Sequence, residues 1–219
     1  MTTEEFSNEF DTLVSSYSNG VWFDEYEKSV FLTKAQESVI TGLYNGSIDS
    51  FEDTEEVRRY LNTLVKTWSS TEYKDDGTGF NDSNSIIIEL PEDVWYITYE
   101  YITTNTGIEI LVVPTPQDEL YKTKNNPFKG PNRRRALRLD CGNNRIEILL
   151  TPQYKDDFSY YKMGYLSKPS PIILTDLTEG LYINNENKKT ECKLHSAIHR
   201  TILESAVKMA ILSKNITAK

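Results

Sequence analysis

The chain has 219 residues, of which 38% are hydrophobic and 26% charged, and its formal net charge at pH 7 is −9. This length can bury a sizeable core, in one large domain or in two small domains packed closely together. The acidic N-terminus has no apolar stretch, which argues against a signal peptide, and no run of residues approaches membrane-spanning length. Cys141 and Cys192 are far apart and have no CxxC or histidine-rich context, so we expect inert, half-buried thiols in a reducing compartment.

The negative charge is concentrated near the N-terminus. Residues 1–60 contain thirteen acidic and four basic side chains, whereas the remaining residues contain twenty of each. The first 60 residues therefore account for the whole net charge. A general nucleic-acid binder needs an excess of lysine and arginine on its contact surface, which this composition disfavours.

Two amphipathic helices are predicted first. One begins near Thr2, which forms a possible capping box with Glu5, and its apolar face comprises Phe6, Phe10, Leu13, Val14 and Tyr17. The other is expected over 25–44, with Asp24 as the N-cap, Glu27 at the third helical position and Gly46 as the stop. Its apolar stripe comprises Leu32, Ala35, Val39, Ile40 and Leu43.

A third helix is expected after Asp53, with Glu56 completing its capping box. Its apolar stripe comprises Val57, Tyr60, Leu61, Leu64, Val65 and Trp68. The polar residues that follow, rich in glycine and aspartate, predict a linker.

Beyond the linker the hydrophobic period changes from helical to extended. Six strands are expected, over 85–90, 94–102, 108–113, 135–140, 145–150 and 160–166. The clearest pair is a hairpin around Gly142, Asn143 and Asn144. A fourth helix is expected over 196–213, beginning at Ser196 or a close neighbour, with Ile198, Ile202, Leu203, Ala206, Val207 and Ala210 on one side.

This order of elements predicts an α+β fold in which a β region of about six mostly antiparallel strands is inserted into a helical layer. The predicted parts are 1–69, the N-terminal helices; 70–84, the linker; 85–190, the β region; and 191–219, the C-terminal helix. We expect the C-terminal helix to pack on the N-terminal helices.

The chain has few candidates for chemistry. His195 and His199 are four residues apart, as in a zinc pair on a helix, but no glutamate lies between them and no third ligand is evident. His199 is better interpreted as packing or capping locally at a helix N-terminus. GxSxG, GxGxxG and GxxxxGK[ST] are all missing, whereas paired catalytic carboxylates have no fixed spacing and stay open. We expect no enzyme activity, no catalytic or metal-binding residues and no cofactor.

Residues 120–139 form a basic segment without any acidic residue. Pro127, Gly130 and Pro131 favour a loop over a helix. A solvated surface loop, an electrostatic contact and a DNA-phosphate contact all fit this composition. The candidate interface residues are Lys122, Lys124, Lys129, Arg133, Arg134, Arg135 and Arg138.

A subunit that is acidic in one part and basic in another can associate head to tail, and such contacts can close into rings. Charge reversal at Arg133, Arg134 and Arg135 is then expected to prevent ring formation. The chain also has 14 tyrosines and 3 tryptophans, including Trp95, Tyr96, Tyr99, Tyr101, Tyr160 and Tyr161. These residues suit an interface, although β-sheet propensity also accounts for many of them.

Several segments resemble the ring or adaptor proteins of crAss-like tailed phages, which infect gut Bacteroides. They are DEYEKSVFLTKAQESVITGLYNG (24–46), FEDTEEVRRYLNTLVK (51–66), IELPEDVWYITYE (88–100), VVPTPQDELYKTKNNPFKGP (112–131), RRALRLD (134–140), SKPSPIIL (167–174) and TECKLHSAIHRTILESAVKMA (190–210). The resemblance covers most of the chain and contains no active-site motif.

The resemblance implies a virion structural protein that forms a ring in the head-to-tail connector. Rings of this class commonly contain about twelve copies and surround the channel for genomic DNA. The implied partners are copies of the chain itself, the portal protein and neighbouring ring or tail proteins, with no membrane and no sequence-specific DNA binding. The implied location is the neck or tail of the virion, after assembly in the host cytoplasm. The alternatives are another phage interaction or DNA-binding protein and a carboxylate-dependent hydrolase.

Overall fold

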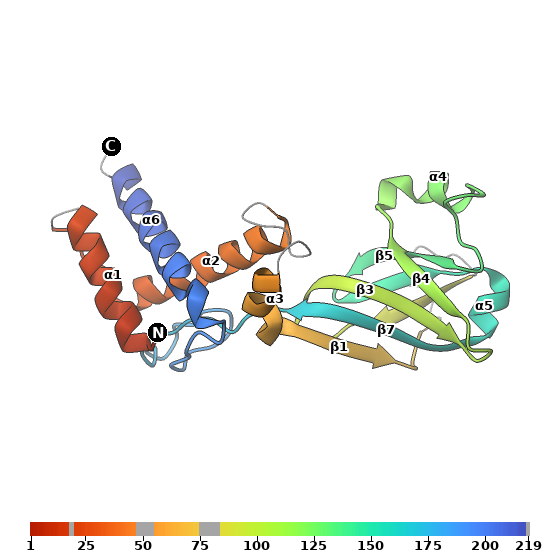
Figure 1. Cartoon of the computed structure of the whole chain (residues 1–219), viewed down its shortest axis with the longest axis horizontal. Coiled ribbons are helices and arrows are strands. Elements are labelled where there is room, and N and C mark those ends of the chain that lie inside the picture. The colour runs from red at the N-terminus through yellow and green to blue at the C-terminus, as the bar shows by residue number, and fades with distance from the viewer. Residues whose placement is uncertain (18–19, 47–54, 75–83, 218–219) are drawn as a thin grey trace. The chain divides into compact units, whose positions relative to one another are not determined.

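The computed structural model describes residues 1–17, 20–46, 55–74 and 84–217 (Figure 1). The chain forms two compact units, and the α+β class predicted from the sequence is confirmed. The helical unit comprises Met1–Leu64 and Pro169–Lys219, and the sheet unit comprises Val65–Lys168. The helical unit thus includes residues 169–190, which the sequence analysis placed in the β region.

The first two helices begin where their capping residues predicted, whereas the C-terminal helix begins at Ser196 as a 3-10 turn. The main helices are α1 (Thr3–Tyr17), α2 (Glu25–Tyr44), α3 (Glu55–Leu61) and α6 (His199–Thr217), with short 3-10 turns at η1 (Asn62–Leu64) and η3 (Ser196–Ile198). Asp24 and Glu27 form the capping box of α2, and Thr2 and Glu5 form the same reciprocal pair before α1. The expected N-cap Asp53 lies outside the described residues. Among the described helices, none has the length and apolar character needed to cross a bilayer.

Helices α1, α2 and α6 lie against one another in the helical unit (Figure 1). Their buried apolar stripes hold the unit together. Lys28 on α2 is buried, and its ammonium group contacts Asp11 at 2.7 Å, Glu25 at 2.9 Å and the Ser7 hydroxyl at 3.1 Å. Burial opposes the charged form of Lys28, but the hydrogen bonds that it donates to Asp11 and Glu25, together with their negative charges, outweigh burial and raise its pKa. This ion pair network attaches α1 to α2.

Polar side chains on α2 bind an extended segment that follows the sheet unit. The Ser29 hydroxyl accepts a hydrogen bond from the Leu174 amide, and Thr33 bonds to both backbone groups of Ile172. Gln36 donates to the Ser170 carbonyl at 3.1 Å. Because these hydrogen bonds satisfy backbone groups away from any sheet, residues 170–174 can be buried against the helix.

The expected third helix ends earlier than its apolar stripe suggested. After α3 and η1 the chain continues as β1 (Val65–Ser70), so the prediction that Val65 and Trp68 are helical is wrong. β1 pairs with β7 along its whole length, and Val65 is exposed while Trp68 packs on the sheet core. A short apolar run fits both periods, and tertiary pairing decided between them.

The sheet unit contains seven strands in one sheet. They are β1, β2 (Ser85–Glu89), β3 (Val94–Thr104), β4 (Glu109–Pro114), β5 (Arg135–Gly142), β6 (Arg145–Leu149) and β7 (Phe158–Ser167). The order is β1-β7-β3-β4-β5-β6-β2, so several strands that are neighbours in the sheet are not consecutive in the chain. β4 and β5 are parallel and the other pairs are antiparallel. Backbone hydrogen bonds between Lys74 and Ile87 join the chain beyond β1 to β2, so the curled sheet brings its two edges together.

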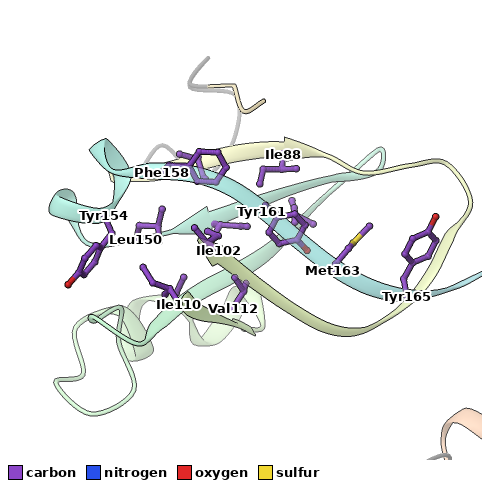
Figure 2. Close-up of a cluster of buried hydrophobic side chains, with 14 residues drawn as sticks. Ile88, Ile102, Ile110, Val112, Leu150, Tyr154, Phe158, Tyr161, Met163 and Tyr165 are labelled. Atoms are coloured by element: carbon purple, nitrogen blue, oxygen red, sulfur yellow. The ribbon is translucent and has the colours of Figure 1, made fainter. Parts of the chain in front are cut away.

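The concave side of this sheet contains its hydrophobic core (Figure 2). Side chains from β2 to β7 meet there, among them Ile88, Ile102, Ile110, Tyr161 and Met163. The predicted hairpin between β5 and β6 is confirmed, and Gly142, Asn143 and Asn144 all have the positive φ angles that favour glycine and asparagine.

Candidate functional site

The basic segment is part of the long connection between the parallel strands β4 and β5. This connection contains the 3-10 turn η2 (Gln117–Glu119) and the short helix α4 (Leu120–Lys124), so the prediction of a loop is wrong for its first five residues. Leu120 is buried and packs with Leu137, Leu139 and Leu149 on the outer face of β5 and β6. The connection is therefore anchored to the sheet by an apolar contact.

The tip of the connection is ordered by its own hydrogen bonds. The Asn126 side-chain oxygen accepts from the Phe128 amide at 2.8 Å and the Lys129 amide at 3.2 Å. The Arg135 guanidinium donates to the Phe128 carbonyl at 2.9 Å. Gly130 is required because a Cβ there would lie 2.7 Å from the carbonyl oxygens of both Asn126 and Lys124. These contacts hold the Phe128 backbone in one position.

The structure places the candidate cations in three environments. Lys122, Lys129, Arg133 and Arg134 are exposed on the connection, and Lys124 and Arg135 are half-buried beside them. The Lys124 ammonium lies 5.5 Å from the centre of the Tyr121 ring. The exposed four form a positive surface, which we call the basic loop surface.

Arg138 differs from the other six candidates because it faces the interior of the sheet unit. Its guanidinium lies 2.6 Å from the Glu100 carboxylate, and the two side chains are only 11% and 5% exposed. The Tyr161 hydroxyl donates to the second Glu100 oxygen at 2.8 Å. The alternation of β5 explains this position, since Arg138 falls on the same face as the core residue Ala136.

This buried trio has an unusual electrostatic balance. Burial raises the pKa of the Glu100 carboxyl above its ordinary value, although Arg138 and Tyr161 both act to lower it. Burial and the Glu100 charge also raise the pKa of Tyr161, so Tyr161 stays a hydrogen-bond donor. Arg138 is therefore engaged in stabilising the sheet interior and is not available to a partner.

The helical unit presents an acidic surface on α1. Residues 1–27 contain seven acids and no lysine or arginine, and Glu4, Glu5 and Glu9 are exposed on this helix. Beside α1, a groove of about 320 Å³ separates it from α6. The groove is lined by Glu9, Thr12, Leu13, Arg200, Leu203 and Glu204.

The two histidines occupy structural positions. His199 is the first residue of α6 and is buried; its Nδ1 lies 2.8 Å from the Met1 amine and its Nε2 lies 2.9 Å from the Leu194 carbonyl oxygen. His195 is the N-cap of η3, and its Nδ1 accepts from the Ala197 amide. Within the described ranges, no three His, Cys, Asp or Glu side chains cluster as a metal site.

Acidification should destabilise the helical unit through His199. Burial lowers the pKa of His199 below its ordinary value of 6.5, so the unfolded chain binds the proton more tightly than the folded one. The stabilisation is present above 6.5 and is lost as the pH falls from there through the lower folded pKa. Urea unfolding followed by far-UV circular dichroism, between about pH 5 and 7.5, measures this slope.

The variant His199→Gln should flatten this pH dependence. His195→Gln is the matched control, because His195 is half-buried and belongs to the adjacent turn. A slope that is equal in wild type and His199→Gln would assign the effect to other groups.

Both cysteines are free and half-buried, as predicted, and burial raises the pKa of both thiols. Phe128, in contrast, was not singled out by the sequence analysis. Its side chain is 85% exposed, although it lies in a well-ordered turn. The sequence feature that could have identified it is a large apolar residue between a proline and a lysine in an otherwise polar segment.

Comparison with known proteins identifies relatives that match nearly the whole chain. A family model described as phage tail ring protein 3/4 matches residues 1–219. Ring protein 3 of Bacteroides phage crAss001 is 44% identical over 227 residues, which cover 98% of this chain and 96% of the relative. Ring protein 4/5 of the same phage is 29% identical over 220 residues, covering 96% and 92%. The chain therefore belongs to the phage tail ring protein 3/4 family of crAss-like phages.

Proposed function

We propose that this protein is a virion structural protein that assembles into a ring of the head-to-tail connector and acts there as an adaptor subunit. Family membership over the full chain supports the ring, because relatives with this name match both units and leave little sequence unmatched. The proposed partners are further copies of the chain, the portal protein and neighbouring ring or tail proteins. Assembly occurs in the host cytoplasm, and about twelve copies close the ring.

The observation that carries the proposal is the uneven distribution of charge, with an acidic surface in the helical unit and a basic surface in the sheet unit. The helical unit has eighteen acidic and eleven basic side chains, whereas the sheet unit has fifteen and thirteen and contains the basic loop surface. Two unlike surfaces with opposite charge favour a heterologous contact, in which each copy uses one surface to bind the next. Repetition of that contact around a closed rotation produces a ring.

The proposed ring surrounds the channel for genomic DNA. Part of the acidic surface of the helical unit faces this channel, where negative charge reduces the counterion-release attraction that a basic wall would create. DNA then passes without sequence-specific binding. The role is structural: the buried carboxylate Glu100 is engaged by Arg138 and Tyr161, which suits a supporting position in the sheet.

Electron microscopy of intact particles tests this function. We expect density for this chain as a closed ring on the symmetry axis between capsid and tail, with the copy number given by the rotational symmetry. Mass photometry of the purified chain complements it, because rings appear as one species at a fixed multiple of the subunit mass. Absence of the chain from purified virions would refute the assignment.

A DNA-binding role is the second candidate, and the composition of the connection favours it. Exposed cations lie there beside the exposed aromatic side chains of Tyr121 and Phe128, a combination that suits a nucleic-acid strand. A duplex affinity that falls linearly with the logarithm of the salt concentration, with a slope reporting several phosphate contacts, would support this alternative.

A further inference from the structure

Phe128 has the properties of an interface anchor. Its ring is 85% exposed, while its backbone is fixed through the Asn126 side chain and the Arg135 guanidinium. An aromatic side chain on a fixed backbone has only two free torsions to lose on binding, and aromatic side chains dominate the energy of many interfaces. Lys129 follows directly and is exposed. The tip of the basic connection is therefore an apolar knob with a cation beside it.

The groove between α1 and α6 has the complementary properties. Leu13 and Leu203 supply its apolar lining, and Glu9 and Glu204 supply two negative charges. α1 and α6 start close together (Figure 1), where the Met1 amine lies 2.8 Å from His199 Nδ1. Residues of these two helices line the groove. Its volume of about 320 Å³ is larger than that of a phenyl ring and lies at the lower end of the range of ligand pockets.

We propose that Phe128 of one copy inserts into the α1–α6 groove of a second copy, with Lys129 lying against Glu9 or Glu204 at the rim. This inference rests on the proposed ring and names the contact that builds it. An apolar centre enclosed by opposite charges is the usual anatomy of a specific interface. Arg133 and Arg134 continue the positive charge along the connection, and Glu4 and Glu5 continue the negative charge along α1.

A second copy is the occupant that the charges favour. The groove has two carboxylates and one guanidinium among its lining residues, and α1 adds further acids, so it repels a nucleic-acid backbone. The knob and the groove are two different surfaces in different units, and when they are used head to tail each copy keeps one knob and one groove for its neighbours.

Cysteine cross-linking between two different variants tests the pairing directly. Lys129→Cys, which keeps the Phe128 ring, and Thr12→Cys are prepared separately, each with Cys141 and Cys192 replaced by alanine, and are mixed with a short bis-maleimide. Lys129 and Thr12 are both exposed, and Thr12 lines the groove. We expect a cross-linked dimer in the mixture and none from Lys129→Cys alone. Tyr182→Cys, at an exposed position of the helical unit, is the matched control partner for Thr12→Cys and should not cross-link.

Sedimentation velocity supplies an independent measurement. Phe128→Ser should weaken self-association by about 10-fold or more, with unchanged thermal unfolding because the ring is exposed. A wild-type chain that stays monomeric at every concentration, or Phe128→Ser that associates as wild type does, would overturn the inference. Loss of duplex binding in Phe128→Ser with intact self-association would also overturn it, by assigning the knob to DNA.

The two proposals fail in different ways. If wild-type rings form and persist in Phe128→Ser, the ring stands and the knob contact is wrong. If the mixed variants cross-link but only open chains appear in electron micrographs, the contact stands and the closed ring is wrong.

Discussion

The double variant Arg133→Glu/Arg134→Glu should abolish ring assembly of the purified chain. Both side chains are exposed on the connection, so their replacement leaves the sheet core intact. Each reversal turns an attraction to the acidic α1 surface of the neighbour into a repulsion, and like charges across an interface cost several kcal/mol. We expect self-association to weaken on the order of 100-fold in mass photometry. Arg135 is kept, because it holds the Phe128 carbonyl.

Reversing the charges on both surfaces distinguishes a specific contact between them from a general effect of net charge. Glu4→Lys/Glu9→Lys should also weaken assembly, and a mixture of the two double variants should associate again. Lys34→Glu/Lys208→Glu is the matched control, because both lysines are exposed on helices and the charge change is identical. Unchanged assembly of Arg133→Glu/Arg134→Glu would reject the basic loop surface as an interface.

Replacement of Arg138 by methionine should destabilise the sheet unit by about 3–5 kcal/mol. The variant removes the cation that lies 2.6 Å from Glu100 and leaves a carboxylate that is only 5% exposed. A buried carboxylate without its cation is neither hydrated nor paired with an opposite charge, so the folded state loses stability. Urea unfolding followed by tryptophan fluorescence measures the change, since Trp68 packs beside Tyr161 in the same core.

An exposed ion pair of the same length provides the control. The Lys74 ammonium also lies 2.6 Å from a carboxylate, that of Glu89, but these side chains are 53% and 55% exposed. Lys74→Met should cost less than about 1 kcal/mol, because water screens and replaces the interaction. Equal effects of the two variants would show that burial does not determine the strength of the Arg138 contact.

The loss of folding stability caused by Arg138→Met should be smaller at low pH. Burial already raises the pKa of Glu100 in the folded protein, and removal of Arg138 raises it further. The folded variant therefore binds a proton more tightly than the unfolded chain, so its stability increases as the pH falls through the folded pKa. A loss of stability that is independent of pH would indicate that the variant mainly loses the packing of the arginine side chain.

Local sequence signals determined the helices and the tightest turn. Asp24 and Glu27 locate the start of α2, because they satisfy amide groups that no helix can satisfy internally. The β5–β6 hairpin follows from three consecutive residues that tolerate positive φ angles. The basic segment and the acidic N-terminal part were equally visible, since charge is a property of composition.

Tertiary structure decided the secondary structure and burial of residues whose partners are distant in the chain. Val65 and Trp68 fit a helix stripe, yet pairing with β7 makes them a strand. Ser29, Thr33 and Gln36 are polar, yet they are buried because they bind the backbone of 170–174. Arg138 belongs to a basic run, yet it faces inward because it pairs with Glu100 on β3. Glu100 in turn accepts a hydrogen bond from Tyr161 on β7. A residue's own chemistry sets which contacts are favourable, but only the folded chain decides which of those partners lies within reach.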